Sequence, residues 1–197
     1  RGRLAAEVLR DQALVIGGLL TEKVGGPPVH PPIPEGVWKP FEGGDKWETP
    51  KPGEENRYRR ALYTYTKRSI PFPTMATFDA PSREFCSPRR LVSNTPLQAL
   101  TMMNDEAFAE AAKGLARRMK YQSEGSVSEK LSAGYRIATA RNPSAGKLSE
   151  LVGLFDKLEA QYASKPELMK GMAGTPDGAA YTIVAQVILN LDEVLTK

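Results

Sequence analysis

The first strong signal along the chain is helical and lies near its start. Apolar side chains recur at three- and four-residue intervals between Leu4 and Leu20, while charged side chains such as Glu7 and Asp11 take other positions. Spacing of this kind places the apolar groups on one face of a helix. The pattern predicts a helix over residues 3–20, which the glycines and prolines that follow would end.

Residues 94–195 carry repeated helix-start signals, each followed by an amphipathic run. Asn94 or Thr95 can cap a helix that has Pro96 in its first turn, where the missing N–H costs little. Asp105 can cap the next helix, whose apolar stripe runs to about residue 120. These signals predict a series of capped helices in the second half of the chain.

The same half continues with a capping box and ends on a strongly apolar element. Ser126 and Glu129 can each satisfy a backbone N–H of one first turn. A further amphipathic helix covers residues 148–162, and the last helix follows Pro176. Apolar residues surround the axis of this last helix, so we expect it to be the central and most buried one.

Between these helical parts lies a long segment with a different character. Twelve of the 16 prolines fall between Pro27 and Pro88, and proline withholds a backbone donor, so residues 25–93 should be irregular. The large side chains of Trp38, Phe41 and Trp47 favour an ordered wrap over a solvated linker. Residues 56–68 suit either a short helix or a short strand.

The predicted fold is therefore mainly α, an antiparallel helical array with a long Pro/Gly-rich irregular segment and room for one short strand pair. We expect one domain over residues 1–197, made of a helix at 3–20, an irregular Pro/Arg-rich wrap at 25–93 and a helical bundle at 94–195. The chain opens at Arg1 and already reads as helix. This indicates the C-terminal domain of a larger protein, with any targeting signal lying upstream.

Charge is uneven along the chain. The net charge is +4 overall, but residues 51–94 carry nine Lys and Arg against four Asp and Glu. Such a patch could meet an anionic ligand, an acidic partner or a glycan, or it could be a surface with internal ion pairs. No apolar run approaches the length of a membrane span, and none is expected.

Most catalytic and metal chemistry is disfavoured by the residue types present. His30 and Cys86 are the only histidine and cysteine. The chain therefore lacks the residues for a zinc site of clustered Cys and His, for a Cys-x-x-Cys-His haem attachment run and for a disulfide, and we expect no metal. Paired carboxylates for hydrolysis would come from Glu7, Asp11, Asp79 or Glu84, although ion pairing is the simpler role. No nucleic-acid motif accompanies the arginines, and no nucleic-acid partner is expected.

Several separated motifs resemble a known family. They are Arg3–Asp11, Tyr58–Arg60 with Tyr63, Thr77–Pro81 with Arg83, Glu84 and Cys86, Asn94–Leu100 through Asp105, and Ala179–Glu193. Together they resemble a C-terminal domain of unknown function, numbered 1553, of large planctomycete-type exported proteins. The resemblance covers residues 3–120 and 178–195, and residues 121–175 have no counterpart in it.

The resemblance implies a partner domain upstream in the same polypeptide and export to the periplasm or cell surface. It also implies that haem c, carried by a cytochrome module, occurs in other parts of the parent protein, with no cofactor in this part. It supplies no assigned active site. The motif residues that are candidates for a ligand site or an interface are Glu7, Arg10, Asp11, Arg59, Arg60, Asp79, Arg83, Arg89 and Arg90.

Two functions fit these residues, and the sequence leaves open whether the protein is an enzyme. The first is an uncharacterised interaction or structural module that docks the upstream domain, in which the arginines meet carboxylates or backbone carbonyls. The second is part of an exported enzyme acting on polysaccharide. Its cleft, shared with the upstream domain, would gather Asp79, Arg83 and Glu7 or Asp11 with unsatisfied groups and a shifted pKa.

Overall fold

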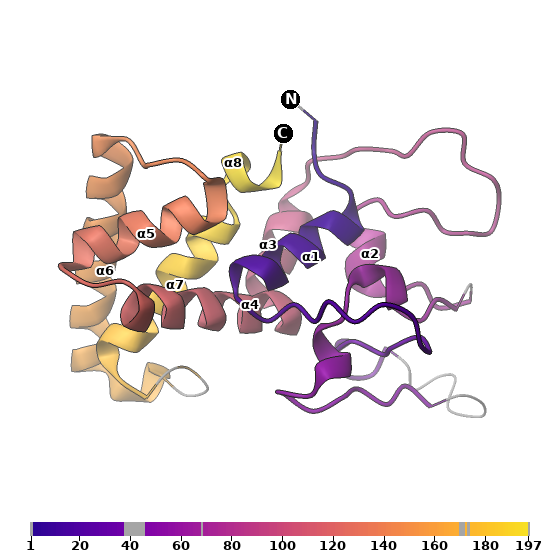
Figure 1. The fold of residues 1–197 in the computed structure, drawn as a ribbon, viewed down its shortest axis with the longest axis horizontal. Coiled ribbons are helices and arrows are strands. Elements are labelled where there is room, and N and C mark those ends of the chain that lie inside the picture. The colour runs from indigo at the N-terminus through magenta and orange to yellow at the C-terminus, as the bar shows by residue number, and fades with distance from the viewer. Residues whose placement is uncertain (1, 38–45, 68, 170–171, 173, 197) are drawn as a thin grey trace.

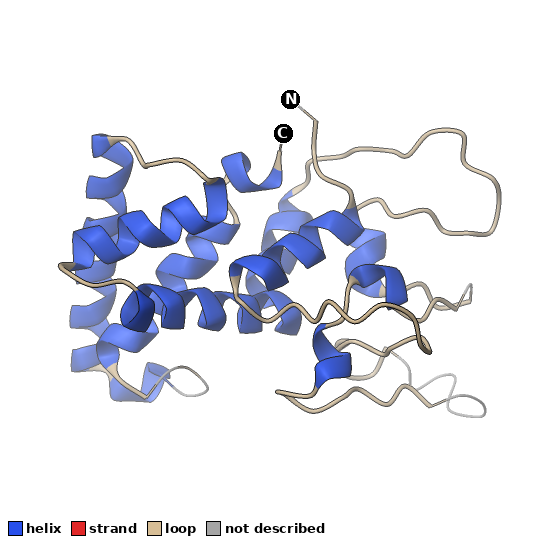
Figure 2. Cartoon of the chain, in the orientation of Figure 1, coloured by secondary structure: helices blue, strands red, loops and turns tan. Residues whose placement is uncertain are grey.

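The computed structural model describes residues 2–37, 46–67, 69–169, 172 and 174–196, and it is mainly helical, as predicted (Figures 1 and 2). The α-helices are α1 (Ala6–Ile16), α2 (Pro73–Thr77), α3 (Pro96–Asn104), α4 (Glu106–Arg117), α5 (Val127–Thr139), α6 (Ala145–Ser164), α7 (Pro176–Leu189) and α8 (Asp192–Leu195). Short 3-10 turns occur at η2 (Glu55–Tyr58), η3 (Ala61–Tyr63) and η5 (Pro166–Met169), and α4 continues into a π-helical turn, η4 (Arg118–Gln122). No described helix has both the length and the apolar character needed to cross a membrane.

The helix starts follow the local signals in the sequence. Thr95 forms a capping box with Gln98 at the start of α3, and Ser126 forms another with Glu129 at the start of α5. Asp105 accepts hydrogen bonds from the first backbone N–H groups of α4. Each cap satisfies donors that the first turn of a helix leaves unpaired, which explains why these boundaries were predictable.

The core forms around α4 and α7. Helix α4 crosses the middle of the molecule and contacts α1 on one side and α7 on the other, so it joins the two halves of the chain (Figure 1). As predicted, α7 is the most buried helix, with Val184, Ala185 and Ile188 fully covered. Phe155 of α6 packs on Tyr181 of α7 with ring centroids 4.6 Å apart.

Two glycines allow α1 and α4 to cross at backbone contact. A Cβ atom built on Gly114 would lie 2.2 Å from the carbonyl oxygen of Gly17, and one built on Gly17 would lie 2.7 Å from that of Ala111. Gly17 and Gly18 also end α1 at Ile16, four residues before the predicted boundary, because Gly18 turns the chain with φ of 68°.

The irregular segment is ordered by side chains in its described part. The indole Nε1 of Trp47 donates to the carbonyl of Pro31 at 2.8 Å, and its ring stacks on Phe72. Trp38 and Phe41, for which a similar role was expected, lie outside the described residues. The ambiguous stretch 56–68 contains 3-10 turns, and only isolated β-bridges replace the short strand pair in the described residues. Helix α2 was not predicted, although Pro73 occupies its first turn.

Candidate functional site

Arg59 is the most deeply buried of the candidate side chains and is 1% exposed. Its guanidinium donates to the carbonyls of Pro27 (3.1 Å), Lys23 (3.2 Å) and Gly25. It also lies over the ring of Tyr63, with Cζ 3.8 Å from the ring centroid. One side chain thus holds a whole turn of the glycine- and proline-rich segment in place, since its planar fork carries five donors.

Arg10 fixes the same segment from the other side. It projects from α1, is 2% exposed, and donates to the carbonyl oxygens of Arg59 at 2.7 Å and Arg57 at 3.1 Å. Burial lowers the pKa of the Arg10 guanidinium, although the carboxylates nearby, Asp11 first among them, oppose the change. The side chain therefore acts as a buried structural donor.

Asp11 accepts two hydrogen bonds from the residues that follow Arg59. The backbone N–H of Ala61 donates to its Oδ1 at 2.6 Å, and Nε of Arg60 donates to its Oδ2 at 3.2 Å. Together with Arg10, this carboxylate attaches the start of η3 to α1. Four of the candidates, Arg10, Asp11, Arg59 and Arg60, thus belong to one network that joins the wrap to the first helix.

A buried arginine outside the candidate set anchors the wrap to α4. Arg57 is 3% exposed and binds Glu110 through Nε (3.0 Å) and Nη2 (2.7 Å), Glu106 at 2.5 Å, and the carbonyl of Pro50 at 2.7 Å. These carboxylates raise the pKa of Arg57 against the effect of burial, which lowers it. The arginine-rich stretch 57–60 was visible in the sequence, but its acidic partners lie about fifty positions further along the chain.

Asp79 closes the base of a long exposed loop between α2 and α3 (Figure 1). Its Oδ2 accepts from both the backbone N–H and the hydroxyl of Ser93 at 2.7 Å, and buried Gln98 donates to the Ser93 hydroxyl at 3.0 Å. Burial raises the pKa of Asp79, but these hydrogen bonds outweigh it and leave the pKa below its usual value. The two ends of the 79–93 loop are therefore held together, as in compact Ω-loops.

A second ion pair ties this loop to α1. Arg90 binds Glu7 in a bidentate manner, through Nη1 to Oε2 at 2.7 Å and Nη2 to Oε1 at 3.1 Å. Burial raises the pKa of Glu7, whereas the Arg90 bonds and the charge of Arg83 lower it to a net decrease. Arg83 and Arg89 are exposed, and neither forms an ion pair within the described part of the chain.

The loop and the helix after it present apolar side chains to solvent. Phe85 is 73% exposed, Leu91 81% and Val92 67%. Leu97 and Leu100 of α3 are also exposed, at 61% and 56%. Isolated exposed apolar residues are ordinary, but here five of them occur within residues 85–100.

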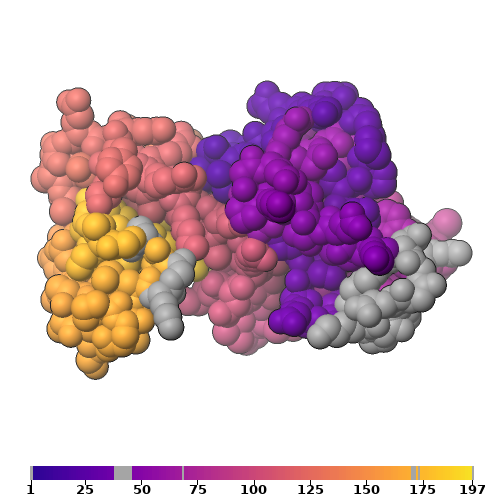
Figure 3. Space-filling model, turned by 90° about the horizontal axis from the view of Figure 1, so that it is seen from below, coloured from indigo at the N-terminus to yellow at the C-terminus, as the bar shows by residue number. Residues whose placement is uncertain are grey.

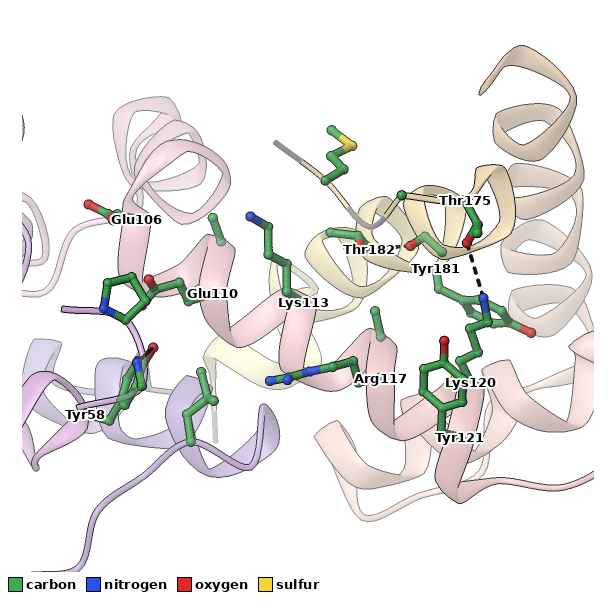
Figure 4. A pocket seen from close by; sticks show the side chains of 18 residues that line it. Tyr58, Glu106, Glu110, Lys113, Arg117, Lys120, Tyr121, Thr175, Tyr181 and Thr182 are labelled. Carbon is green, nitrogen blue, oxygen red and sulfur yellow. Dashed lines mark hydrogen bonds between the residues drawn. The ribbon is translucent and has the colours of Figure 1, made fainter. Parts of the chain in front are cut away.

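A separate pocket lies outside all nine candidates. It has a volume of about 790 Å³ and lies between residues 52–58 of the wrap, α4 and the start of α7. Lys113 and Arg117 point into it from α4, with Tyr58 and Glu110 on one side and Thr175 and Tyr181 on the other (Figure 4). No cluster of three or more potential metal ligands occurs among the described residues.

With this geometry described, comparison with known proteins places the chain. The family model described as PSD1, Protein of unknown function (DUF1553), matches residues 1–155. The chain belongs to this family. All nine candidates and α4 lie within the part shared with the DUF1553 family, and so do residues 121–155, for which the sequence offered no counterpart. The match does not extend to residues 178–195.

No curated protein and no solved structure matches the chain significantly. The DUF1553 assignment therefore rests on the family model alone, and its description names no activity. Function has to be argued from the contacts within the domain itself.

Proposed function

We propose that this DUF1553 domain is an interaction module that docks a preceding domain of the same exported, cytochrome-associated polypeptide. The docking surface would be formed by the 79–93 loop and the exposed face of α3. The observation that carries the proposal is the contrast between a rigidly held loop base and an apolar loop surface. Asp79 and Arg90 fix the ends of the loop, while Phe85, Leu91 and Val92 face solvent.

The arginines support this role because most of them are engaged within the domain. Arg10 and Arg59 donate to backbone carbonyls, and Arg60 and Arg90 bind carboxylates. This is the pattern expected of a structural module. Among the nine candidates, Arg83 and Arg89, both on the exposed loop, are the arginines left to meet a carboxylate of a partner domain. Arginine is well suited to interfaces because it combines bidentate bonding with stacking.

The alternative, a polysaccharide-acting enzyme with a shared cleft, needs a carboxyl group that is free to act as acid or base. Glu7 is occupied by Arg90, Asp11 by Arg60 and Ala61, and Asp79 by Ser93. The pKa values of Glu7 and Asp79 are lowered, opposite to the change that a general acid requires. We therefore rank this alternative second.

Cys86 offers a direct test, since it is the only cysteine of the chain, is exposed, and lies in the 79–93 loop. Its alkylation rate would be followed by peptide-resolved mass spectrometry in the parent polypeptide and in the separate domain, once circular dichroism shows the latter to be helical. If the domains dock, alkylation of Cys86 should be about tenfold slower or more in the parent polypeptide. A tenfold change corresponds to a docked state favoured by about 1.4 kcal/mol.

The matched control is a second cysteine introduced as Val24→Cys, because Val24 is 89% exposed and lies outside the loop. Its alkylation rate should be the same in both forms. The substitution Leu91→Asp in the parent should restore fast alkylation of Cys86 by weakening the docked state. Equal rates for Cys86 in parent and separate domain would refute docking through this loop.

A further inference from the structure

The pocket beside α4 is a hollow of the size that small ligands occupy. Its volume of about 790 Å³ falls within the usual range of roughly 300 to 1,000 Å³ for ligand sites. Seen from below, the surface is hollowed between the C-terminal helices and the N-terminal half of the chain (Figure 3). None of the lining residues belongs to the 79–93 loop, so the pocket is independent of the proposed docking surface.

Charge changes sign along the floor of this pocket. At one end, Glu106 and Glu110 already bind the buried guanidinium of Arg57. The other end carries Lys113, Arg117 and Lys120, which share one face because they are spaced four and three residues apart. The carboxylates at the first end are thus partly neutralised from within, and the cations at the second end dominate what a ligand would meet.

At the cationic end, Arg117 keeps free capacity. Lys120 pairs with Asp177 at 2.7 Å, and this carboxylate raises the pKa of the ammonium. Arg117 is exposed, points into the hollow, and has no ion pair or hydrogen bond from its side chain within the described residues (Figure 4). A planar guanidinium without a partner at the centre of a concave site is suited to bidentate binding of a carboxylate.

The walls next to these cations are apolar or aromatic. Tyr58 and Leu19 line the side of the wrap, while on the side of α7 the ring of Tyr181 is 3% exposed and packs on Phe155. The α4 floor is lined there by the small residues Ala109 and Ala116, which leave room above the helix. A flat ring fits such a space because aromatic faces pack on rings over a large area.

We propose that this pocket binds a small organic anion in which a carboxylate is attached to a ring, with the carboxylate on Arg117 and the ring against Tyr58 and Leu19. The π-helical turn η4, which directly follows Arg117, belongs to the same site because it contributes Lys120 and Tyr121 to the lining. Single π-helical turns within α-helices occur often at functional sites. The two ring chemistries that share this description are aromatic acids and sugar acids.

Titration calorimetry and amide NMR with four probes would test the site: benzoate, D-glucuronate, D-glucose and inorganic phosphate. At least one of the two ring carboxylates should bind with a Kd of about 1 mM or tighter, and which one does so distinguishes an aromatic from a sugar ligand. Glucose lacks the charge and phosphate lacks the ring, so each should bind more weakly by about tenfold or more. The amide shifts caused by binding should centre on Ala109, Lys113 and Arg117.

The substitution Arg117→Gln should weaken that binding by about tenfold, since it removes a charge-assisted fork. The fold should be unaffected, because Arg117 has no internal partner to lose. Arg136→Gln, which removes an exposed arginine of α5 outside the pocket, should leave binding unchanged. Failure of both ring carboxylates to bind, equal binding of glucose or phosphate, or full binding by Arg117→Gln would each overturn the proposal.

Discussion

Arg59 provides the sharpest prediction about what holds this domain together. Its guanidinium donates hydrogen bonds to three backbone carbonyls that would otherwise need water, those of Lys23, Gly25 and Pro27. It also lies on the ring of Tyr63. The substitution Arg59→Met keeps a long side chain of similar reach but removes every donor and the charge. The variant should stay folded and be less stable, because the glycine- and proline-rich turn loses the group that fixes it.

The magnitude follows from the contacts. Each lost hydrogen bond contributes about 1 to 1.5 kcal/mol net, and the cation–π contact about 0.5 to 1 kcal/mol. Two terms act in the opposite direction, since Nε of Arg59 is buried with no partner and methionine is readily buried. We expect a net loss of about 3 kcal/mol, which most single domains survive. Arg59→Lys should cost about 2 kcal/mol, because an ammonium cannot reach three separated carbonyls.

Urea unfolding followed by circular dichroism would measure the change, with Arg136→Met as the control on an exposed helical arginine, expected within about 0.5 kcal/mol of the parent. Hydrogen exchange adds a local readout. The amides of Thr21 and Val29 bond to the carbonyls of Tyr58 and Tyr63, and they should exchange faster in Arg59→Met than amides of α7. A loss below about 1 kcal/mol, or equal acceleration throughout, would refute the reasoning.

Two further predictions concern helix α4. In urea unfolding, Gly114→Ala should lower the free energy of unfolding by about 2 to 4 kcal/mol, because the added methyl would meet the backbone of Gly17. The control Gly153→Ala has open space around it and should raise the free energy of unfolding by up to about 1 kcal/mol. Equal effects of the two substitutions would contradict the backbone contact. Burial raises the pKa of Asp105 despite the hydrogen bond from Thr74. The folded state therefore holds the carboxyl proton of Asp105 more tightly than the unfolded state does. As pH rises from the unfolded-state pKa through the folded-state pKa, the contribution of this carboxyl to stability falls. The stability of Asp105→Asn relative to the parent should therefore improve as pH rises above about 4, the ordinary pKa of an aspartate, and a flat difference would contradict this.

The helices were predictable because their signals are local. Thr95, Asp105 and Ser126 cap helices through partners two or three residues away, so the sequence alone contains both halves of each interaction. The burial of α7 was also predictable, because a helix that is apolar on all sides is stable only when its whole surface is covered. The end of α1 was misplaced because the apolar pattern runs on to Leu20, whereas Gly18, with φ of 68°, turns the chain directly after Gly17.

The candidate site was predictable in composition but not in geometry. The sequence marked Arg10, Arg59 and Asp79 as motif residues. Arg10 and Arg59, however, donate to backbone carbonyls. Every residue carries a backbone carbonyl, so the sequence does not indicate which carbonyls these arginines bind. The partners of Asp79 lie 14 and 19 positions away across an irregular loop. The pocket was missed because it combines α4 with α7, although the four- and three-residue spacing from Glu106 to Lys120 was a signal of one polar face.

The buried arginines and the many prolines have a common physical explanation. A proline contributes a backbone carbonyl but no N–H, so a segment with twelve prolines between residues 27 and 88 carries more acceptors than donors. Arginine has five donors and no acceptor and corrects this imbalance. Arg59 donates to Pro27, Arg57 donates to Pro50, and the indole of Trp47, another pure donor, donates to Pro31. The basic charge of residues 51–94 is thus largely a requirement of folding. Among the described arginines of this stretch, Arg83 and Arg89 have no such internal role and are the ones to examine for partner binding.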